Sequence, residues 1–197
     1  GIMLNEQRKY NEAEISYKKA LALKPDHVET YNNLGNTLKE QSKFIEAEAS
    51  YKKALRLKPD HIETYNNLGC MLIDQGKFFE AEAYLRKAIS LNPDYTEAYS
   101  NLGNTLQGLG KIEEAIENYD KAIKLNINYA KAYHNKNLCL NYSSLFSPLY
   151  IYRQHLKFEK QFGKVHTKPS SNVNIKKKPD ERLRIGYVSG DFRKHSV

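Results

Sequence analysis

Apolar and small residues recur along most of the chain at the spacing of amphipathic helices. Tyr31, Leu34 and Leu38 fall on one helical face, and Ala47 and Tyr51 fall on a second one after a polar interval. A proline follows each such pair of segments, where a helix has to end. The pattern therefore predicts a unit of helix, turn and helix.

The same pattern returns with a period of 34 residues. The columns are Pro25, Pro59 and Pro93; Leu34, Leu68 and Leu102; Gly35, Gly69 and Gly103; and Tyr31, Tyr65, Tyr99 and Tyr133. A fixed period of this kind indicates an array in which stacked neighbours bury each other's apolar faces. The glycine and Ala47 are small where we expect two helices to approach closely.

This pattern resembles the tetratricopeptide repeat (TPR), and the resemblance implies an all-α, right-handed solenoid whose first helices line a concave groove. Full units cover residues 28–61, 62–95 and 96–129, after a partial unit at 1–27. The unit at 130–163 is degenerate, because Lys136 and Asn137 replace the Leu-Gly pair and Arg153 replaces an aromatic residue. Gly1 falls inside a first helix, so we expect an earlier repeat to have been cut.

Amide side chains form two rows along the first helices of the units. The sixth residue of each unit is Asn33, Asn67, Asn101 and Asn135, and the ninth is Asn36, Cys70 and Asn104. A carboxamide donates and accepts hydrogen bonds together, so these rows are candidates to hold an extended peptide. Hydrogen bonding between repeats is the alternative. Asn32 and Asn66 stand where some TPR domains carry the lysine of a chaperone-tail clamp, which argues against such a clamp.

The net charge of +8 belongs to the last quarter of the chain, because residues 1–150 carry 19 basic and 19 acidic side chains. The lysine run at 176–178 lacks interleaved aromatic residues, so a solvated linker is favoured over a nucleic-acid site. Cys70 and Cys139 are too far apart for a zinc motif or a disulfide framework and fit a cytoplasmic protein. We expect no metal ligands, no cofactor in the chain, and neither nucleic acid nor a membrane as partner.

Beyond the repeats, Ser147 and Pro148 predict the start of one more helix, whose apolar face carries Ile151, His155, Phe158 and Phe162. Residues 164–181 mix proline, serine and lysine without periodicity and predict a linker. Residues 182–189 alternate as a strand does and then reach a Ser-Gly-Asp turn. A single strand needs partners, so we expect the C-terminus to have been cut as well.

The run at 183–197, LRIGYVSGDFRKHSV, resembles the opening of the catalytic region of O-linked N-acetylglucosamine transferases, which also follows a TPR array. The resemblance implies an incomplete α/β start of a GT-B fold with Rossmann-like lobes. It also implies a parent enzyme that transfers GlcNAc from UDP-GlcNAc to Ser or Thr of proteins without a metal, with His195 at the catalytic cleft. The chain itself lacks the nucleotide-binding lobe and is expected to be inactive. The alternative is a stand-alone TPR adaptor that mediates protein–protein interaction.

Overall fold

The computed structural model describes residues 1–163, all of whose regular structure is helical. The predicted linker, the predicted α/β start and His195 lie outside the described residues. The ten helices are α1 (Ile2–Glu6), α2 (Tyr10–Leu23), α3 (Val28–Glu40), α4 (Phe44–Leu57), α5 (Ile62–Asp74), α6 (Phe78–Leu91), α7 (Thr96–Gly108), α8 (Ile112–Leu125), α9 (Ala130–Leu140) and α10 (Pro148–Phe162). None of these helices has the length and apolar character that crossing a bilayer requires.

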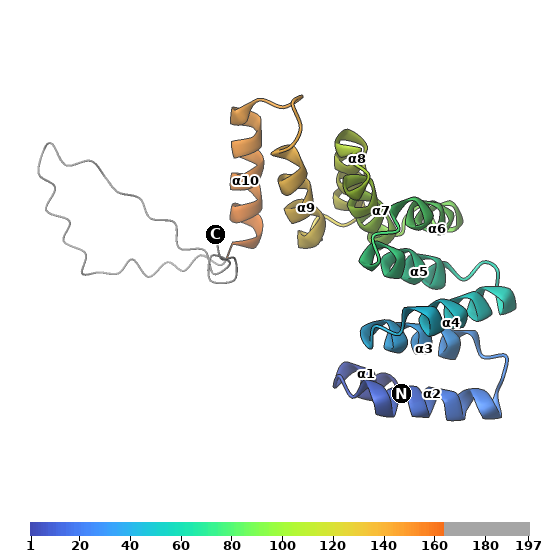
Figure 1. Cartoon of the computed structure of the whole chain (residues 1–197). Helices are drawn as coiled ribbons and strands as arrows, with labels where there is room; N and C mark the ends of the chain where they lie inside the picture. Colours follow the sequence, from blue (N-terminus) through green and yellow to red (C-terminus); the bar gives the residue numbers. More distant parts are fainter. Residues whose placement is uncertain (164–197) are drawn as a thin grey trace, which may run out of the picture. The chain divides into compact units, whose positions relative to one another are not determined.

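The helices of residues 1–163 stack in pairs, one pair after another (Figure 1). The first helices are the odd-numbered ones and the second helices are the even-numbered ones. Within a pair α3 packs on α4, α5 on α6 and α7 on α8, and each pair contacts the next through α4 and α5, α6 and α7, and α8 and α9. Successive first helices also touch, as α3 does α5 and α5 does α7. The predicted all-α TPR solenoid is confirmed for this part of the chain.

Each pair is held together by a glycine of the first helix that receives a large side chain of the second. A Cβ would lie 2.5 Å from Tyr51 Cε1 if added at Gly35, 2.7 Å from Leu85 Cγ if added at Gly69, and 2.5 Å from Tyr119 Cε1 if added at Gly103. These distances are far below van der Waals contact, so any larger residue at the glycine would displace the ring or the leucine. The 34-residue glycine column is therefore a packing requirement.

The turn inside each pair uses one residue in the left-handed region. Gly76 and Gly110 occupy it with φ of 71° and 74°. Ser42 and Arg8 stand at the equivalent places with φ of 60° and 57°, although their side chains make this conformation costly. The turn therefore prefers glycine, and two of the four repeats tolerate a strained residue there.

The unit at 130–163 departs from the others in its core. Lys136, which replaces the usual leucine, is buried, and its Nζ lies 2.6 Å from Asp120 Oδ1 of α8. Asn137 Nδ2 donates to the Gln154 carbonyl of α10 at 3.5 Å. In the other units a Leu-Gly pair packs against a large side chain of the second helix; here polar contacts take the place of that packing. Arg153, which stands where the aromatic residue would be, is exposed.

The prediction that His155 lies on the buried face of α10 is wrong, because its side chain is exposed. Ile151, Phe158 and Phe162 do pack against the core. Among the described helices α9 is the main neighbour of α10, so only a narrow stripe of α10 is covered and His155 falls beside it. A helix with neighbours on one side alone buries fewer positions than its apolar pattern suggests.

Candidate functional site

The structure places both amide rows on the first helices. Asn33 lies on α3, Asn67 on α5, Asn101 on α7 and Asn135 on α9, at equivalent places of successive repeats. Asn101 is buried, with 6 % of its surface exposed, whereas the other three are half-buried. The rows therefore lie at the boundary between the core and the surface of the first helices.

Three amides of the first row donate a hydrogen bond to the preceding repeat. The Nδ2 atoms of Asn67, Asn101 and Asn135 lie 3.1, 2.9 and 2.7 Å from the Oδ1 atoms of Asn32, Asn66 and Asn104. These are bonds between repeats, the alternative to ligand contact. A carboxamide has two N–H groups and an oxygen with two lone pairs, so a single donated bond leaves the oxygen and the second N–H for another partner.

The second row is oriented by buried tyrosines. Tyr51 Oη donates to Asn36 Oδ1 at 2.6 Å, and Tyr119 Oη donates to Asn104 Oδ1 at 2.8 Å. Burial raises the pKa of both phenols, so they stay protonated and can donate at any ordinary pH. Because the oxygen of each amide accepts from its tyrosine, the Nδ2 group is left as a donor for another partner.

The middle repeat breaks this second row. Cys70 replaces the asparagine, and Leu85 replaces the tyrosine that would donate to it. Burial is the largest influence on the pKa of the Cys70 thiol and raises it, while the charges of Lys39 and Lys131 oppose the rise. A thiol with a raised pKa is a poor nucleophile, which agrees with a packing role for Cys70.

Two hollows open on the first helices, beside these amides. The first hollow, of about 420 Å³, is lined by Asn5, Glu6, Tyr10, Asn36, Lys39, Glu40 and Asn67. The second hollow, of about 180 Å³, is lined by Lys39, Cys70, Ile73, Asp74, Asn101, Asn104 and Lys131. Four of the six predicted site asparagines thus line a hollow, and Asn33 and Asn135 line neither of these two.

Lys39 belongs to both hollows. Its Nζ lies 3.2 Å from a Glu40 oxygen and 3.7 Å from an Asp74 oxygen. Burial lowers the pKa of Lys39, but the two carboxylates outweigh burial and the net shift is upward, so the ammonium stays charged. Sequence reasoning missed Lys39 and Lys131, and the signal that could have found them is their place on the same helices as the asparagines.

A buried network behind the first row was also missed. Asn32 Oδ1 accepts from Thr64 Oγ1 at 3.0 Å as well as from Asn67, and Thr64 Oγ1 lies 2.7 Å from His61 Nδ1. The hydroxyl proton of Thr64 goes to Asn32, so His61 donates through Nδ1. The His-x-x-Thr spacing at His27 and His61, 34 residues apart, was the available signal.

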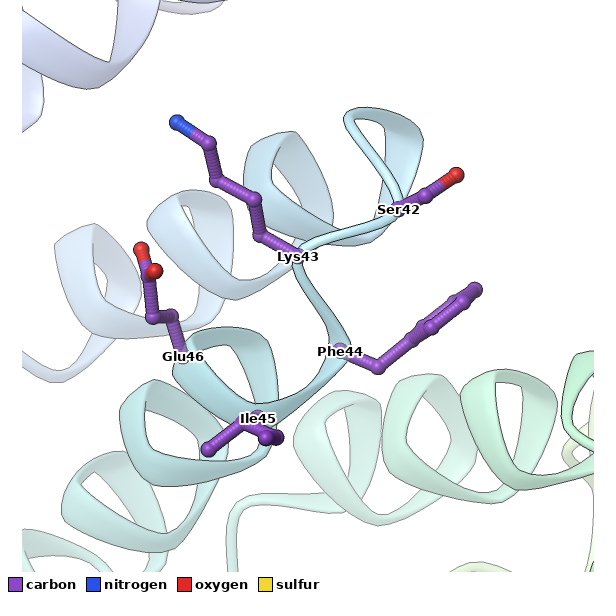
Figure 2. A pocket seen from close by; sticks show the side chains of 5 residues that line it. All are labelled: Ser42, Lys43, Phe44, Ile45 and Glu46. Atoms are coloured by element: carbon purple, nitrogen blue, oxygen red, sulfur yellow. The ribbon is translucent and has the colours of Figure 1, made fainter.

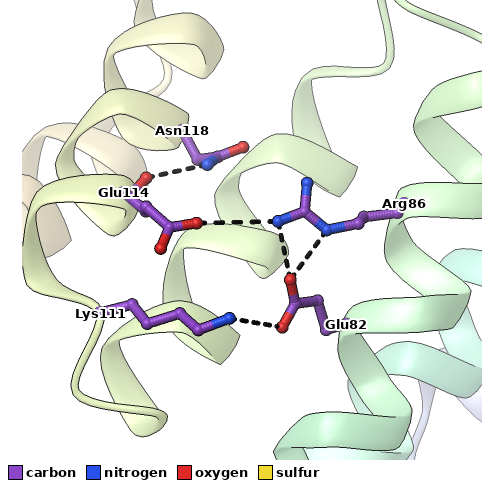
Figure 3. A network of polar contacts seen from close by, with 5 residues as sticks. All are labelled: Glu82, Arg86, Lys111, Glu114 and Asn118. Carbon is purple, nitrogen blue, oxygen red and sulfur yellow. Dashed lines mark hydrogen bonds and ion pairs between the residues drawn. The ribbon is translucent and has the colours of Figure 1, made fainter.

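The second helices carry charges instead of amides. Glu82 lies 2.7 Å from Arg86 within α6 and 3.3 Å from Lys111, which directly precedes α8 of the next pair, and Arg86 also lies 3.8 Å from Glu114 (Figure 3). Asn118 Nδ2 donates to the backbone oxygen of Glu114 at 2.8 Å. These partly exposed pairs connect neighbouring repeats, and their charged groups are paired with one another, so we assign them a structural role.

A third hollow lies at the turn between α3 and α4 (Figure 2). Five consecutive residues line it, from Ser42 to Glu46, and Ile45 is 87 % exposed. The residues come from one short segment and their side chains point in different directions in Figure 2. Such an arrangement cannot enclose a ligand. Across residues 1–163 no group of three or more His, Cys, Asp or Glu is arranged to hold a metal ion.

Several solved structures are similar to this chain. A crystal structure of MamA is 28 % identical with a TM-score of 0.71, covering 84 % of this chain and 91 % of the other. The first TPR of Spaghetti (RPAP3), bound to the HSP90 peptide SRMEEVD, is also 28 % identical with a TM-score of 0.57, covering 58 % and 91 %. An O-GlcNAc transferase of Thermobaculum terrenum is 24 % identical with a TM-score of 0.65, covering 68 % of this chain but only 26 % of the enzyme, so it shows the fold alone.

No curated protein matches the chain. Sequence profiles described as tetratricopeptide repeat match residues 1–60, 26–94 and 96–129, which together exceed half of the chain. These matches agree with the helix pairs and the glycine interlock described above. The chain belongs to the tetratricopeptide repeat family.

Proposed function

We propose that this chain is a protein-interaction region that binds an extended peptide segment of a partner along the two amide rows. The observation that carries the proposal is the orientation of Asn36 and Asn104, which line the hollows and whose oxygens accept from Tyr51 and Tyr119, so that each Nδ2 group is left as a donor for a ligand. An extended peptide presents backbone C=O groups that such donors can bind. The Spaghetti (RPAP3) structure supports the idea, because that TPR holds a peptide.

The amides of the first row can supply hydrogen-bond acceptors beside these donors. The oxygens of Asn67 and Asn101 are available to accept from peptide N–H groups, since each amide spends one N–H on the preceding repeat. The first helices therefore offer both donors and acceptors, the two kinds of group that a peptide backbone can pair with. Each bond contributes about 0.5–1.5 kcal/mol net, so several must act together.

A substitution can separate ligand binding from folding in the second row. In the double variant Asn36→Asp and Asn104→Asp a carboxylate oxygen still accepts from the buried tyrosine, but the outward N–H donors are lost. We expect an uncharged peptide, selected on the wild-type protein from a random library, to bind this variant about 5- to 100-fold more weakly by fluorescence anisotropy. Helicity and the urea midpoint should stay close to those of the wild type.

Asn118→Ala is the matched control, because Asn118 lies on α8 away from both hollows. Unchanged affinity in the aspartate variant, with the fold intact, would assign the amide rows to structure alone. The double variant Asn67→Ala and Asn101→Ala tests the first row, and its loss of two bonds between repeats is followed separately through the urea midpoint.

A second candidate function is the peptide-holding part of a protein glycosyltransferase that uses UDP-GlcNAc. The observation that favours it is the run at 183–197, which ends near His195 and resembles the start of such catalytic regions. The test is transfer of labelled GlcNAc to Ser/Thr peptides by the product of the full gene, with His195→Ala as the matched variant. Absence of transfer by the full gene product, or transfer unaffected by His195→Ala, would count against this role.

A further inference from the structure

The two hollows on the first helices are the same place in the fold, one repeat apart. Asn36 and Cys70, Glu40 and Asp74, and Asn67 and Asn101 are pairs that differ by 34 residues, and one member of each pair lines each hollow. Lys39 lines both. An extended ligand that follows the amide rows would therefore meet two successive, equivalent subsites.

The two hollows differ in charge. The first hollow holds two carboxylates, Glu6 and Glu40, against the ammonium of Lys39. The second holds two ammonium groups, Lys39 and Lys131, against the carboxylate of Asp74. Glu6 and Lys131, which make the difference, are both exposed and able to reach a ligand. Apart from the shared Lys39, the first subsite carries two carboxylates and no ammonium group, whereas the second carries one of each, so the first subsite is the more negative and the second the more positive of the two.

The distance between the subsites fits a short interval along a peptide. Neighbouring first helices are in direct contact, which places their axes about 8–10 Å apart. A polyproline II chain advances about 3.1 Å per residue and brings every third side chain to the same side. Side chains three positions apart, about 9 Å along the chain, would therefore enter adjacent hollows.

We propose that the hollows select a peptide that carries one basic and one acidic side chain three positions apart, the basic one seated in the first hollow and the acidic one in the second. This inference rests on the proposed peptide-binding function and names the class of ligand. The amides hold the backbone whatever its sequence, while the two charged hollows fix the register of the peptide. Both charges are partly solvated, so each correct placement should contribute about a twofold to fivefold gain in affinity.

The experiment uses four fluorescein-labelled peptides with the same Ala/Ser host sequence. They carry Lys and Glu, Glu and Lys, Lys and Lys, or Glu and Glu, three positions apart, and their affinities for the full chain are measured by fluorescence anisotropy at low salt. We expect one of the two mixed peptides to bind more tightly than both like-charged peptides, by about fourfold or more. The preference should weaken as salt is added.

Reversal of charge on the protein tests the placement. Lys131→Glu should remove the preference for the acidic side chain, so that the Lys and Lys peptide becomes the tightest ligand, whereas Lys124→Glu on exposed α8 surface should not. Glu6→Lys should have the opposite effect, with Glu117→Lys as its control. All four positions are exposed, so the variants should fold.

The outcomes separate this inference from the function on which it rests. Equal affinity for all four peptides, or tightest binding of a like-charged peptide to the wild type, overturns the charge pattern. If the Asn67→Ala and Asn101→Ala variant then still weakens binding, peptide capture by the amides stands without it. If the amide substitutions leave the affinities unchanged, or if no peptide binds, both the charge pattern and the proposed peptide-binding function are contradicted.

Discussion

Restoring the tyrosine–asparagine pair in the middle repeat tests whether that pair is a unit of structure. The outer repeats carry Tyr51 with Asn36 and Tyr119 with Asn104, at 2.6 and 2.8 Å, whereas the middle repeat carries a leucine and a cysteine. The test compares the wild type with three variants: Cys70→Asn, Leu85→Tyr and the double variant. The glycine opposite Leu85 leaves the same room that receives a tyrosine ring in the neighbouring repeats.

The magnitudes follow from the hydrogen bond. Leu85→Tyr alone buries a phenol without its acceptor and should lower the free energy of unfolding by about 1–3 kcal/mol. Cys70→Asn alone should cost less, because residue 70 is partly exposed and water can bind the new amide. The double variant regains a neutral hydrogen bond, so its loss should be smaller than the sum of the single losses by about 1 kcal/mol.

The assay is urea unfolding followed by far-UV circular dichroism, with the m-value compared among the four proteins to confirm that the same transition is observed. Losses that add within about 0.3–0.5 kcal/mol would refute the reasoning, because independent positions behave in that way. In that case the tyrosines would act only by filling space, and the orientation of Asn36 and Asn104 would need another cause.

Three further predictions concern stability. Hydrogen bonds from two lysines lower the pKa of Glu14 to about 2 in the folded chain, so the stability that Glu14 contributes is complete above about pH 5 and is lost as the pH falls toward 2. In urea unfolding, Glu14→Gln should therefore lower the free energy of unfolding by about 1 kcal/mol at neutral pH and leave it unchanged in strong acid. Glu117→Gln is the control and should leave stability unchanged at either pH. Asp120→Ala leaves the buried ammonium of Lys136 without its partner and should lower the free energy of unfolding by about 1–3 kcal/mol, whereas Lys136→Leu should leave it unchanged or raise it. Equal losses of stability in the two variants would contradict a buried charge pair. Ser42→Gly removes a strained left-handed residue and should raise the melting temperature, by calorimetry, and a decrease would argue against strain there.

The fold could be predicted from the sequence because the residues that packing requires recur at the same position of each repeat. Gly35 admits Tyr51 in one repeat, and Gly103 admits Tyr119 in another, so the period itself reports a close approach of two helices. His155 was misplaced because periodicity gives the apolar face of a helix but not how many neighbours cover it. The amino-acid pattern therefore predicts the helices better than it predicts which residues are buried at the end of the array.

The candidate site was only partly readable. The asparagine rows and their place on the first helices follow from spacing, but the partner of each amide depends on rotamers and on how neighbouring repeats stack. Asn67 could have faced solvent, yet its Nδ2 reaches Asn32 of the preceding repeat. Lys39 and Lys131 come from units far apart in sequence, and the stacking of the helices brings them to one hollow.

The bonds from Asn67 to Asn32 and from Asn101 to Asn66 make ligand geometry and array geometry inseparable. Pulling the two ends of the array apart would lengthen these bonds and turn the amides away from the peptide backbone that we propose they bind. For the peptide site that we propose, tension along the array would therefore weaken binding, and a bound peptide would oppose stretching of the array.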